Sequence, residues 1–175
     1  VLRTREPGGT PAGERIREIV LSPDYEGLDP RAEALLFAAA RGEHVARVIR
    51  PALDAGSVVV CDRYLDSSVA YQGYGRDLGP DTVRDLSIWA SRSLVPDLTV
   101  LLDLPAEEGL ARKSGDGRTR FEEGFDEAFH ARVAHGFRAL AAAEPARWRT
   151  FDARRPKGEL AEEIASAVRL ATLRR

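Results

Sequence analysis

Short apolar runs recur along the chain and are separated by longer segments with helical periodicity. The clearest run, Ser57–Asp62, is rich in valine, follows Gly56 and has the length of a buried strand. Leu98–Asp103 has the same character, and Val1–Thr4 and Arg149–Asp152 are shorter candidates. The pattern therefore predicts four strands.

The segments between these runs carry start signals for helices. Thr10 followed by Pro11, and Asp29 followed by Pro30, each match an N-cap residue with proline at the first helical position. The apolar positions from Pro30 onward predict a long helix that bends before Pro51. Further helices are predicted over about 80–93, 105–113, 125–143 and 157–173.

Strands that alternate with helices pair in parallel through right-handed crossovers. The expected fold is therefore α/β, with a parallel sheet flanked by helices in three layers. In such folds, ligands bind beyond the carboxyl ends of the strands. The residues that follow Ser57–Asp62 are accordingly the first place to look for chemistry.

Composition narrows the class of protein. The 175 residues suffice for one domain, 1–175, and the formal net charge of −2 argues against a general nucleic-acid binder. A single cysteine, Cys61, excludes an intrachain disulfide and a cysteine-rich metal site. No apolar run approaches membrane-spanning length and no signal-peptide pattern is present, so a cytoplasmic protein without a membrane partner is expected.

The stretch "CDRYLDSSVAYQGYGR" crowds polar groups directly after the second predicted strand. Asp62 can hold Mg²⁺ beside phosphates, and the planar guanidinium of Arg63 can grip a phosphate with two hydrogen bonds. A surface salt bridge explains this pair equally well. Four polar groups suited to the edge of a planar heterocycle follow within one span of six residues: Ser67, Ser68, Tyr71 and Gln72. Their density favours a binding site over a simple solvated turn.

Two further clusters are weaker when taken alone. Phe37 and Arg41 are four residues apart and share a helix face, where a ring can stack on a base, although a core role is the simpler explanation for Phe37. In "REPGGTPAGERIRE", the glycines allow close approach of a ligand to Glu6 and Arg17, or simply form a tight turn.

A basic loop, "ARKSGDGRTRFEE", contains Arg112, Arg118 and Arg120 around two glycines. Such a loop can close over phosphates, or it can be an ordinary solvated loop. The three histidines, at positions 44, 130 and 135, lack metal-ligand spacing and are interpreted as structural or surface residues. Cys61 is interpreted as a packing residue on a buried strand.

The ordered set of motifs closely resembles bacterial thymidylate kinase over nearly the whole chain. The motifs that carry the resemblance are "TREPGGTPAGERIREIVL", "EALLFAAAR", "CDRYLDSSVAYQGYGR", "PDLTVLLDLPAEEGLAR" and "RFE". The resemblance implies a P-loop nucleoside-monophosphate-kinase fold and transfer of the γ-phosphoryl group of ATP to dTMP, forming dTDP, with Mg²⁺. It also implies a homodimer formed through helix faces.

The resemblance implies a role for each residue of the nucleoside site. Phe37 would stack on thymine, and Arg41 would bond the exocyclic oxygen of the base. Ser68 and Gln72 would complete recognition of the base edge. Tyr71 would pack beside the deoxyribose and disfavour a ribose.

The phosphate end of the substrate would meet a second set of residues. Arg63 and Arg17 would hold the dTMP phosphate, with Glu6 near the sugar–phosphate region and Ser67 among the substrate-binding groups. Asp62 would lie by the magnesium ion. In the lid, about 112–123, the resemblance implies that Arg112, Arg118 and Arg120 clamp ATP and the transferring phosphoryl group, with Arg63, Arg118 and Arg120 as the catalytic arginines.

Two departures from the family pattern stand out. Thr119 occupies a lid position that usually carries Asp or Asn. Residues 1–175 contain no G-x-x-x-x-G-K-[ST] phosphate loop, and the two lysines, Lys113 and Lys157, do not follow a glycine-rich loop of that type. The family places that loop after a strand in the middle of the sheet, so the expectation is that the sequence is incomplete at its N-terminus.

Two alternative functions stay open at this point. One is a related deoxynucleotide kinase, against which "DRYLDSSVAYQGYGR" and "REPGGT" argue. The other is a catalytically inactive module that binds dTMP but not ATP, which the missing phosphate loop favours.

Overall fold

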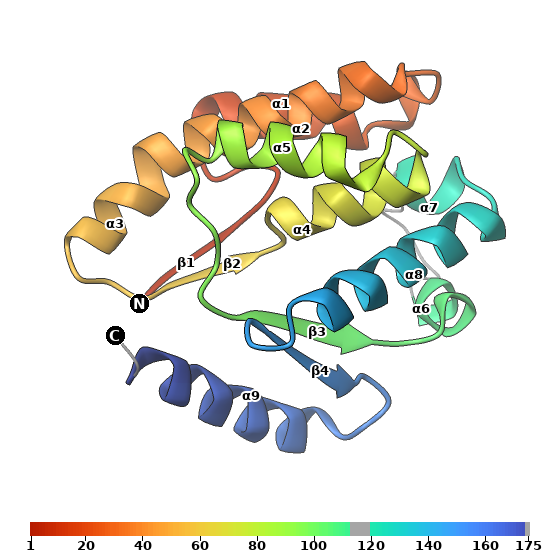
Figure 1. Cartoon of the computed structure of the whole chain (residues 1–175). Helices are drawn as coiled ribbons and strands as arrows, with labels where there is room; N and C mark the ends of the chain where they lie inside the picture. Colours follow the sequence, from red (N-terminus) through yellow and green to blue (C-terminus); the bar gives the residue numbers. More distant parts are fainter. Residues whose placement is uncertain (113–119, 174–175) are drawn as a thin grey trace.

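The computed structural model describes residues 1–112 and 120–173 and shows an α/β fold with strands among helices (Figure 1). The strands are β1 (Leu2–Arg5), β2 (Val59–Asp62), β3 (Thr99–Asp103) and β4 (Trp148–Asp152). All four lie within one or two residues of the predicted runs. The predicted α/β class is confirmed.

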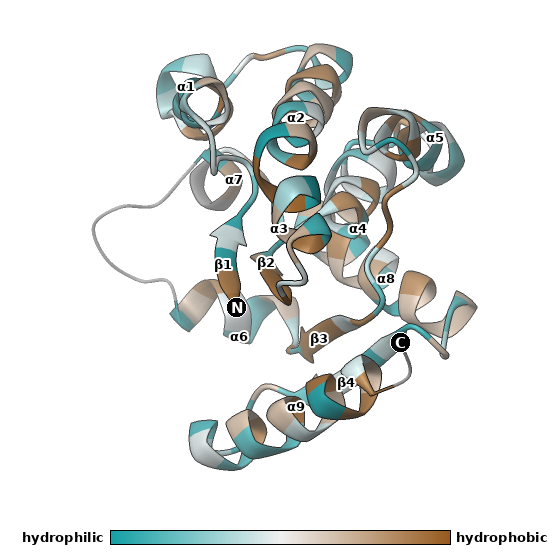
Figure 2. Ribbon diagram, turned by 90° about the vertical axis from the view of Figure 1, so that its left-hand side faces the viewer, coloured by the Kyte–Doolittle hydropathy of each residue, from teal (hydrophilic) through white to brown (hydrophobic). Residues whose placement is uncertain are grey.

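The strands pair in parallel, as predicted, but they form two separate pairs. β1 pairs with β2, with Leu2 opposite Val59 and Arg5 opposite Asp62. β3 pairs with β4, with Thr99 opposite Trp148. Among the described residues, no ladder joins β2 to β3, and Figure 2 shows the two pairs as separate groups.

A large cavity of about 1000 Å³ lies between the two strand pairs. Its walls come from β2, β3 and one face of the last helix, and they are mostly apolar, including Val58, Val60, Leu101, Ile164 and Val168. Val60 on β2 is 49% exposed and Leu102 on β3 is 52% exposed. Two apolar strands thus remain uncovered on the sides that face this cavity.

Helices enclose the strands on both sides. In Figure 1, α1, α2 and α5 form a layer above β1 and β2, and α9 lies beyond β3 and β4. The described helices are α1 (Pro11–Leu21), α2 (Pro30–His44), α3 (Arg50–Asp54), α4 (Leu65–Ser68), α5 (Pro80–Ala90), α6 (Ala106–Arg112), α7 (Arg120–Glu123), α8 (Glu127–Ala143) and α9 (Lys157–Thr172), with a short 3₁₀ turn at Pro23–Tyr25.

The predicted helix starts are confirmed by their capping bonds. The Thr10 hydroxyl accepts a hydrogen bond from the Gly13 amide at 3.0 Å, and Pro11 is the first residue of α1. The Asp29 carboxylate accepts from the amides of Arg31 and Ala32 at 2.9 and 3.1 Å. These caps satisfy donors that a helix N-terminus otherwise leaves unpaired.

The predicted long helix contains a π-helical segment, Val45–Ile49, between α2 and α3. In this segment, the Arg50 amide donates to the Val45 carbonyl, five residues back. Pro51 follows directly and has no amide proton to continue the α-helical ladder. At the position of the expected bend before Pro51, the hydrogen bonds thus change locally from the α-helical to the π-helical pattern. Such π-helical turns are a common cause of bends in helices.

The polar stretch after β2 is helical, which the hydrophobic pattern did not predict. It begins with α4 and continues as a π-helical segment, Val69–Gly75. A Cβ on Gly75 would lie 2.7 Å from the Phe129 ring, and a Cβ on Gly73 would lie 2.9 Å from Pro80. These glycines let the stretch pack closely against α8 and the start of α5.

We call this helical segment, which consists of α4 and Val69–Gly75, the polar helix. The core has two clusters built around it. One joins Val69 to Val83, Leu140 and Trp148, and the other joins Ala70 to aromatic and aliphatic residues of α7 and α8. The face opposite these apolar residues is left for the polar groups of the stretch. None of the described helices is long and apolar enough to cross a membrane.

Candidate functional site

A small cavity of about 110 Å³ lies beside the carboxyl ends of β1 and β2. It is walled by residues from the turn after β1, from α1 and α2, and from the polar helix after β2. It is lined by all nine residues for which the family resemblance implied contact with dTMP: Glu6, Arg17, Phe37, Arg41, Arg63, Ser67, Ser68, Tyr71 and Gln72. Segments up to 66 positions apart thus meet where the topology predicts a ligand.

Arg41 is the centre of a buried polar network at one end of this cavity. Its side chain is 2% exposed and forms an ion pair with Glu6, with Nε 2.9 Å from Oε2. Its two terminal nitrogens donate to the hydroxyls of Ser68 and Ser87 at 2.9 and 3.1 Å. A buried guanidinium needs such partners, and these fix its plane against the cavity.

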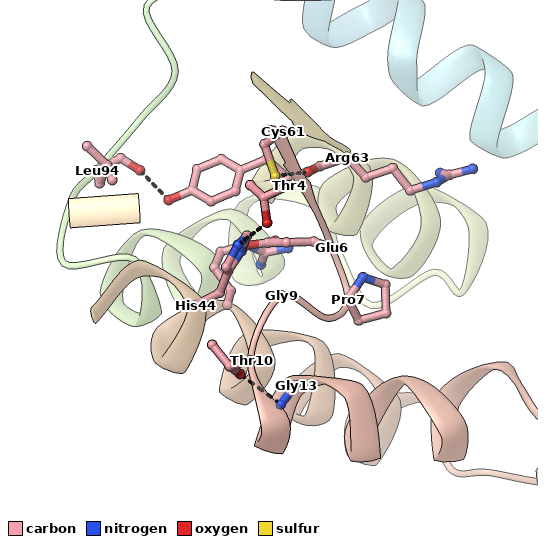
Figure 3. A network of polar contacts seen from close by, with 12 residues as sticks. Thr4, Glu6, Pro7, Gly9, Thr10, Gly13, His44, Cys61, Arg63 and Leu94 are labelled. Atoms are coloured by element: carbon pink, nitrogen blue, oxygen red, sulfur yellow. Dashed lines mark hydrogen bonds and ion pairs between the residues drawn. The ribbon is translucent and has the colours of Figure 1, made fainter. Parts of the chain in front are cut away.

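The second oxygen of Glu6 contacts a histidine that sequence analysis interpreted as structural. His44 Nδ1 lies 3.1 Å from Glu6 Oε1, and Nε2 lies 2.7 Å from the Thr4 hydroxyl, as Figure 3 shows. His44 is fully buried. Gly9 packs on its ring with a φ of +79°, where a Cβ would lie 2.6 Å from Nε2. The network therefore explains both the glycine in "EPGG" and the buried histidine.

Aromatic rings form the opposite side of the cavity. The rings of Phe37 and Phe121 have centroids 6.1 Å apart, and Tyr71 meets Phe121 edge to face at 5.5 Å. Phe121 belongs to the motif "RFE", and no role at the site was predicted for it. At about 110 Å³ the cavity is smaller than a typical ligand pocket, so a nucleotide requires some side-chain displacement around these rings.

The polar helix places Ser68 and Gln72 four residues apart, on one face beside Arg41. Both side chains are buried, with 4% and 1% of their surface exposed. Gln72 Nε2 donates to Glu33 Oε1 at 2.9 Å, a contact that sequence analysis did not predict. The site thus presents a row of fixed hydrogen-bonding groups opposite an aromatic wall.

Arg63 lies at the open end of the cavity, just beyond β2. Its φ of 64° is a left-handed conformation, which is uncommon outside glycine and typical of functional sites. Its carbonyl accepts a hydrogen bond from the Cys61 thiol at 3.0 Å (Figure 3). Its guanidinium lies 5.1 Å from the centroid of the Tyr71 ring, in cation–π contact.

Arg17 completes a positive group at this end. Its Nη1 donates to the Pro7 carbonyl at 2.9 Å. Its pKa is lowered from the usual value, mainly by partial burial and next by the nearby charge of Arg5, with Arg63 also contributing. The guanidinium groups of Arg17 and Arg63 both line this end of the cavity and suit an anion such as phosphate.

The small cavity adjoins the large one at this positive end. Arg63, Tyr64, Ser67, Tyr71 and Phe121 line both cavities. Asp62 lies at the end of β2 and lines the large cavity only. An anion held by Arg63 would therefore face the carboxylate of Asp62 and the space between the strand pairs.

Cys61 precedes this site without joining it chemically. Burial raises the pKa of its thiol to about 12, so the thiol is protonated at neutral pH. Its proton is donated to the Arg63 carbonyl, which supports the left-handed turn. The interpretation of Cys61 as a packing residue rather than a nucleophile agrees with this geometry.

The three arginines predicted for the lid differ in where the structure places them. Arg118, like Thr119, lies outside the described residues. Arg112 donates to the Ala153 carbonyl at 3.0 Å, at the end of α6. Arg120 is fully buried in an ion pair with Glu33 at 2.6 Å and does not line the small cavity, so in this conformation it is not available to clamp a phosphoryl group.

The arrangement suits one class of small molecule. An aromatic wall faces fixed donors and acceptors, which fits a planar heterocycle, and a group of guanidiniums lies at the open end, which fits a phosphate. Within the described ranges 1–112 and 120–173, no group of three or more histidine, cysteine or acidic side chains could hold a metal by itself. A nucleoside monophosphate matches both ends of the cavity.

Comparison with known proteins agrees with this chemistry. The family profile described as thymidylate kinase matches residues 1–164. The thymidylate kinase of Leifsonia xyli subsp. xyli is 57% identical over 166 residues, which are 94% of this chain and 78% of the relative. That of Clavibacter michiganensis subsp. michiganensis is 55% identical, over 97% of this chain and 78% of the relative.

A third relative, with slightly lower identity, gives a similar match. The thymidylate kinase of Solidesulfovibrio magneticus is 51% identical over 175 residues, covering 96% of this chain and 84% of the relative. Similarity at this level across nearly the whole chain is far above what a shared fold alone produces. The chain therefore belongs to the thymidylate kinase family, the enzymes that phosphorylate dTMP to dTDP with ATP as the phosphoryl donor.

Proposed function

We propose that the small cavity is the dTMP site, with the base at the Arg41 end and the phosphate at the Arg63 end. The observation that carries this proposal is the convergence of nine expected residues on one cavity. Phe37 stacks on thymine, Arg41, Ser68 and Gln72 read the edge of the base, and Tyr71 packs beside the sugar. Glu6 acts indirectly, because its carboxylate fixes the guanidinium of Arg41.

At the other end, Arg63 and Arg17 bind the acceptor phosphate, with Ser67 beside them. Their charges lower the repulsion between the acceptor phosphate and an incoming phosphoryl group, which is the main electrostatic barrier to this reaction. The cavity walls orient the attacking phosphate oxygen toward the large cavity. In-line transfer is then an effectively unimolecular step, because both reactants are already held in position. The protein contributes position and charge, with no covalent intermediate.

Asp62 is our candidate for holding Mg²⁺. Its exposed carboxylate lies beside the phosphate end, and one carboxylate with waters and substrate phosphates is the usual environment of Mg²⁺ in kinases. The absence of a larger acidic cluster among the described residues fits an ion held mainly by phosphates. When bound, the ion would neutralise charge on the phosphoryl oxygens.

We further infer that the ATP half of the site requires a strand between β2 and β3, followed by a phosphate loop. The large cavity supports this inference because its lining is mostly apolar and it is bordered by two strands that have no partner on that side in the described structure. Residues 1–175 contain no phosphate-loop motif. A glycine-rich loop at the end of such a strand would lie next to Asp62 and Arg63.

The decisive experiment titrates dTMP and ATP separately into residues 1–175 and into the same chain extended at its N-terminus by a strand and a G-x-x-x-x-G-K-[ST] loop. We expect dTMP to bind both proteins, and ATP binding and dTDP formation to occur only in the extended one. ATP binding by residues 1–175 would contradict the role of the added strand. Failure of dTMP to bind either protein would contradict the assignment of the small cavity.

The same titration tests the remaining alternative functions. A dTMP-binding module without catalysis predicts dTMP binding and no dTDP formation in either protein. A related deoxynucleotide kinase predicts that the extended protein phosphorylates dCMP or dGMP faster than dTMP. The family assignment makes dTMP the expected acceptor.

We also propose a homodimer through the outer face of α2 and α5. Leu35 on α2 is 57% exposed and Trp89 on α5 is 81% exposed, and the two helices pack against each other. Large exposed apolar side chains on adjacent helices are typical of subunit interfaces. Light scattering after size-exclusion chromatography should give a dimer mass that Trp89→Glu shifts toward the monomer; a monomer at all concentrations would contradict the proposal.

A further inference from the structure

Glu33 is a fully buried carboxylate on α2 that does not line the small cavity. It binds three side chains from other parts of the fold. Oε1 accepts from Gln72 Nε2 at 2.9 Å, and Oε2 lies 2.6 Å from nitrogens of both Arg76 and Arg120. The two arginines provide the opposite charge that a buried carboxylate needs.

The contact with Glu33 fixes the orientation of the Gln72 amide. An ionised carboxylate can only accept hydrogen bonds, so the NH₂ group of Gln72 must face it. The carbonyl oxygen of the same amide then points to the other side. Gln72 lines the small cavity, so the oxygen on the side away from Glu33 is the group that the amide can present to a ligand.

The orientation has a direct consequence for base recognition. Thymine and uracil carry a proton on ring nitrogen N3 and donate from it, whereas N3 of cytosine carries a lone pair and accepts. A fixed carbonyl oxygen at the base edge accepts from the first two bases and repels the third. An amide that could rotate would satisfy either kind of ring.

We propose that Glu33 is a positioning residue for base specificity, which holds Gln72 with its oxygen toward the N3 edge of the base. The proposal rests on the proposed dTMP site, since it requires the base to lie in the small cavity. Arg76 and Arg120 both pair with Glu33, and the buried Arg120 holds the carboxylate in place when Arg76 is replaced. Arg41 reads the exocyclic oxygen independently, so that Glu33 supplies one of two contributions to discrimination against cytosine.

A purely structural role for Glu33 is the competing explanation. Its ion pairs join α2 to the polar helix and to α7, and breaking them would loosen the whole cavity. That role predicts that all pyrimidine nucleotides lose affinity together. Positioning of Gln72 predicts that nucleotides with different N3 chemistry respond differently.

The test is calorimetric titration of the full chain with dTMP, dUMP and dCMP. In Glu33→Gln the residue facing Gln72 can donate or accept, so the Gln72 amide is free to rotate. We expect the ratio of dTMP to dCMP affinity to fall about tenfold, the equivalent of one hydrogen bond to an unsatisfied partner, with dUMP following dTMP. Glu33→Asp retains a carboxylate and should recover part of the ratio.

Arg76→Gln is the matched control. It removes one cation from the same carboxylate but leaves the carboxylate that accepts from the Gln72 amide, so the affinity ratio should change much less than in Glu33→Gln. If Glu33→Gln does not fold, Glu33→Gln with Arg76→Gln removes one charge of each sign and should show the same loss of ratio. Equal loss for all three nucleotides, or the same fall in ratio in Arg76→Gln alone, contradicts the positioning role. Absence of dTMP binding in the unaltered chain contradicts the proposed site instead.

Discussion

At the residue scale, Arg63 combines an unusual backbone conformation with an exposed position at the site. Its φ of 64° would be favourable for glycine, and a side chain at this position costs about 1 kcal/mol. The Cys61 thiol and the neighbouring strand hold the turn in place. The strained conformation directs the guanidinium toward the point where the two cavities meet.

Replacing Arg63 separates its backbone and side-chain roles. Arg63→Ala should weaken dTMP binding about 10- to 100-fold, because a charge-assisted contact to phosphate contributes about 1.5–3 kcal/mol. Thymidine, which has no phosphate, should bind almost unchanged. Both affinities follow from calorimetric titration.

Two further variants sharpen this comparison. Arg63→Gly should lose dTMP affinity equally but be more stable than Arg63→Ala, since glycine adopts a positive φ without strain. Arg15→Ala, on the exposed face of α1, removes a guanidinium that pairs with Glu18 and does not line the small cavity, so it should alter neither affinity. Equal losses of dTMP and thymidine in Arg63→Ala would show that Arg63 does not act through the phosphate.

At the scale of elements, the contact between the polar helix and α8 decides where the site lies. Gly136 on α8 receives the Tyr74 ring from the π-helical segment, and a Cβ there would lie 2.7 Å from Tyr74 Cδ2. Gly75 makes the reciprocal close approach to Phe129. Glycines on both elements thus allow the polar helix and α8 to pack closely, and this packing sets the position of the binding face of the polar helix.

Gly136→Ala should therefore destabilise the fold although alanine is the better helix former. Overpacking costs about 1–3 kcal/mol and the gain in helix propensity is about 1 kcal/mol, so the net loss should be up to about 2 kcal/mol. Thermal unfolding should show a Tm lowered by several degrees. In the control Gly158→Ala, on α9, no described atom lies within 4 Å of the added Cβ, so Tm should stay constant or rise. A higher Tm for Gly136→Ala would mean that Tyr74 moves aside freely.

At the scale of the whole molecule, a cluster of charges ties the C-terminal strand pair to the helices around the site. Arg147, just before β4, binds Asp66 of α4 at 2.6 Å and Glu144 at the end of α8 at 2.9 Å. Arg84 of α5 also binds Glu144, at 2.8 Å. The cluster therefore connects β4 and α8 with the polar helix and α5.

The cluster predicts a loss of stability in acid. The hydrogen bond from Arg147 is the main cause that lowers the pKa of Glu144 from 4.5 to about 2. Because the folded pKa is below the unfolded one, this stabilisation is complete above pH 4.5 and is lost as the pH falls toward 2. Glu144 is partly exposed, so the contribution should be about 1 kcal/mol or less.

Urea unfolding between pH 7 and pH 2.5 measures this contribution. The unfolding free energy of Glu144→Gln should fall less steeply below pH 4.5 than that of the unaltered chain. The two curves should differ most near neutral pH and converge in acid. Parallel curves over the whole range would show that Glu144 does not gain stability from its arginine partners.

Much of this protein was determined by local sequence. Strand runs, N-caps at Thr10 and Asp29, and the disturbance before Pro51 depend on residues a few positions apart, and the structure confirms them. The ordered motifs also identified the family, because each motif is a contiguous run. The polar helix after β2 was missed because its π-helical register depends on packing against α5 and α8 rather than on periodicity.

Only the tertiary structure decided which partner each charged side chain takes. Arg41 and Glu6 are 35 positions apart and Arg120 and Glu33 are 87 apart, so their pairing depends on how whole helices pack. That packing buries Arg120, for which the family resemblance implied a phosphate clamp, and it connects Glu33 to Gln72. Sequence specified the residue types that a nucleotide site needs, whereas burial, which removes competing water, selected the partners that fix them in place.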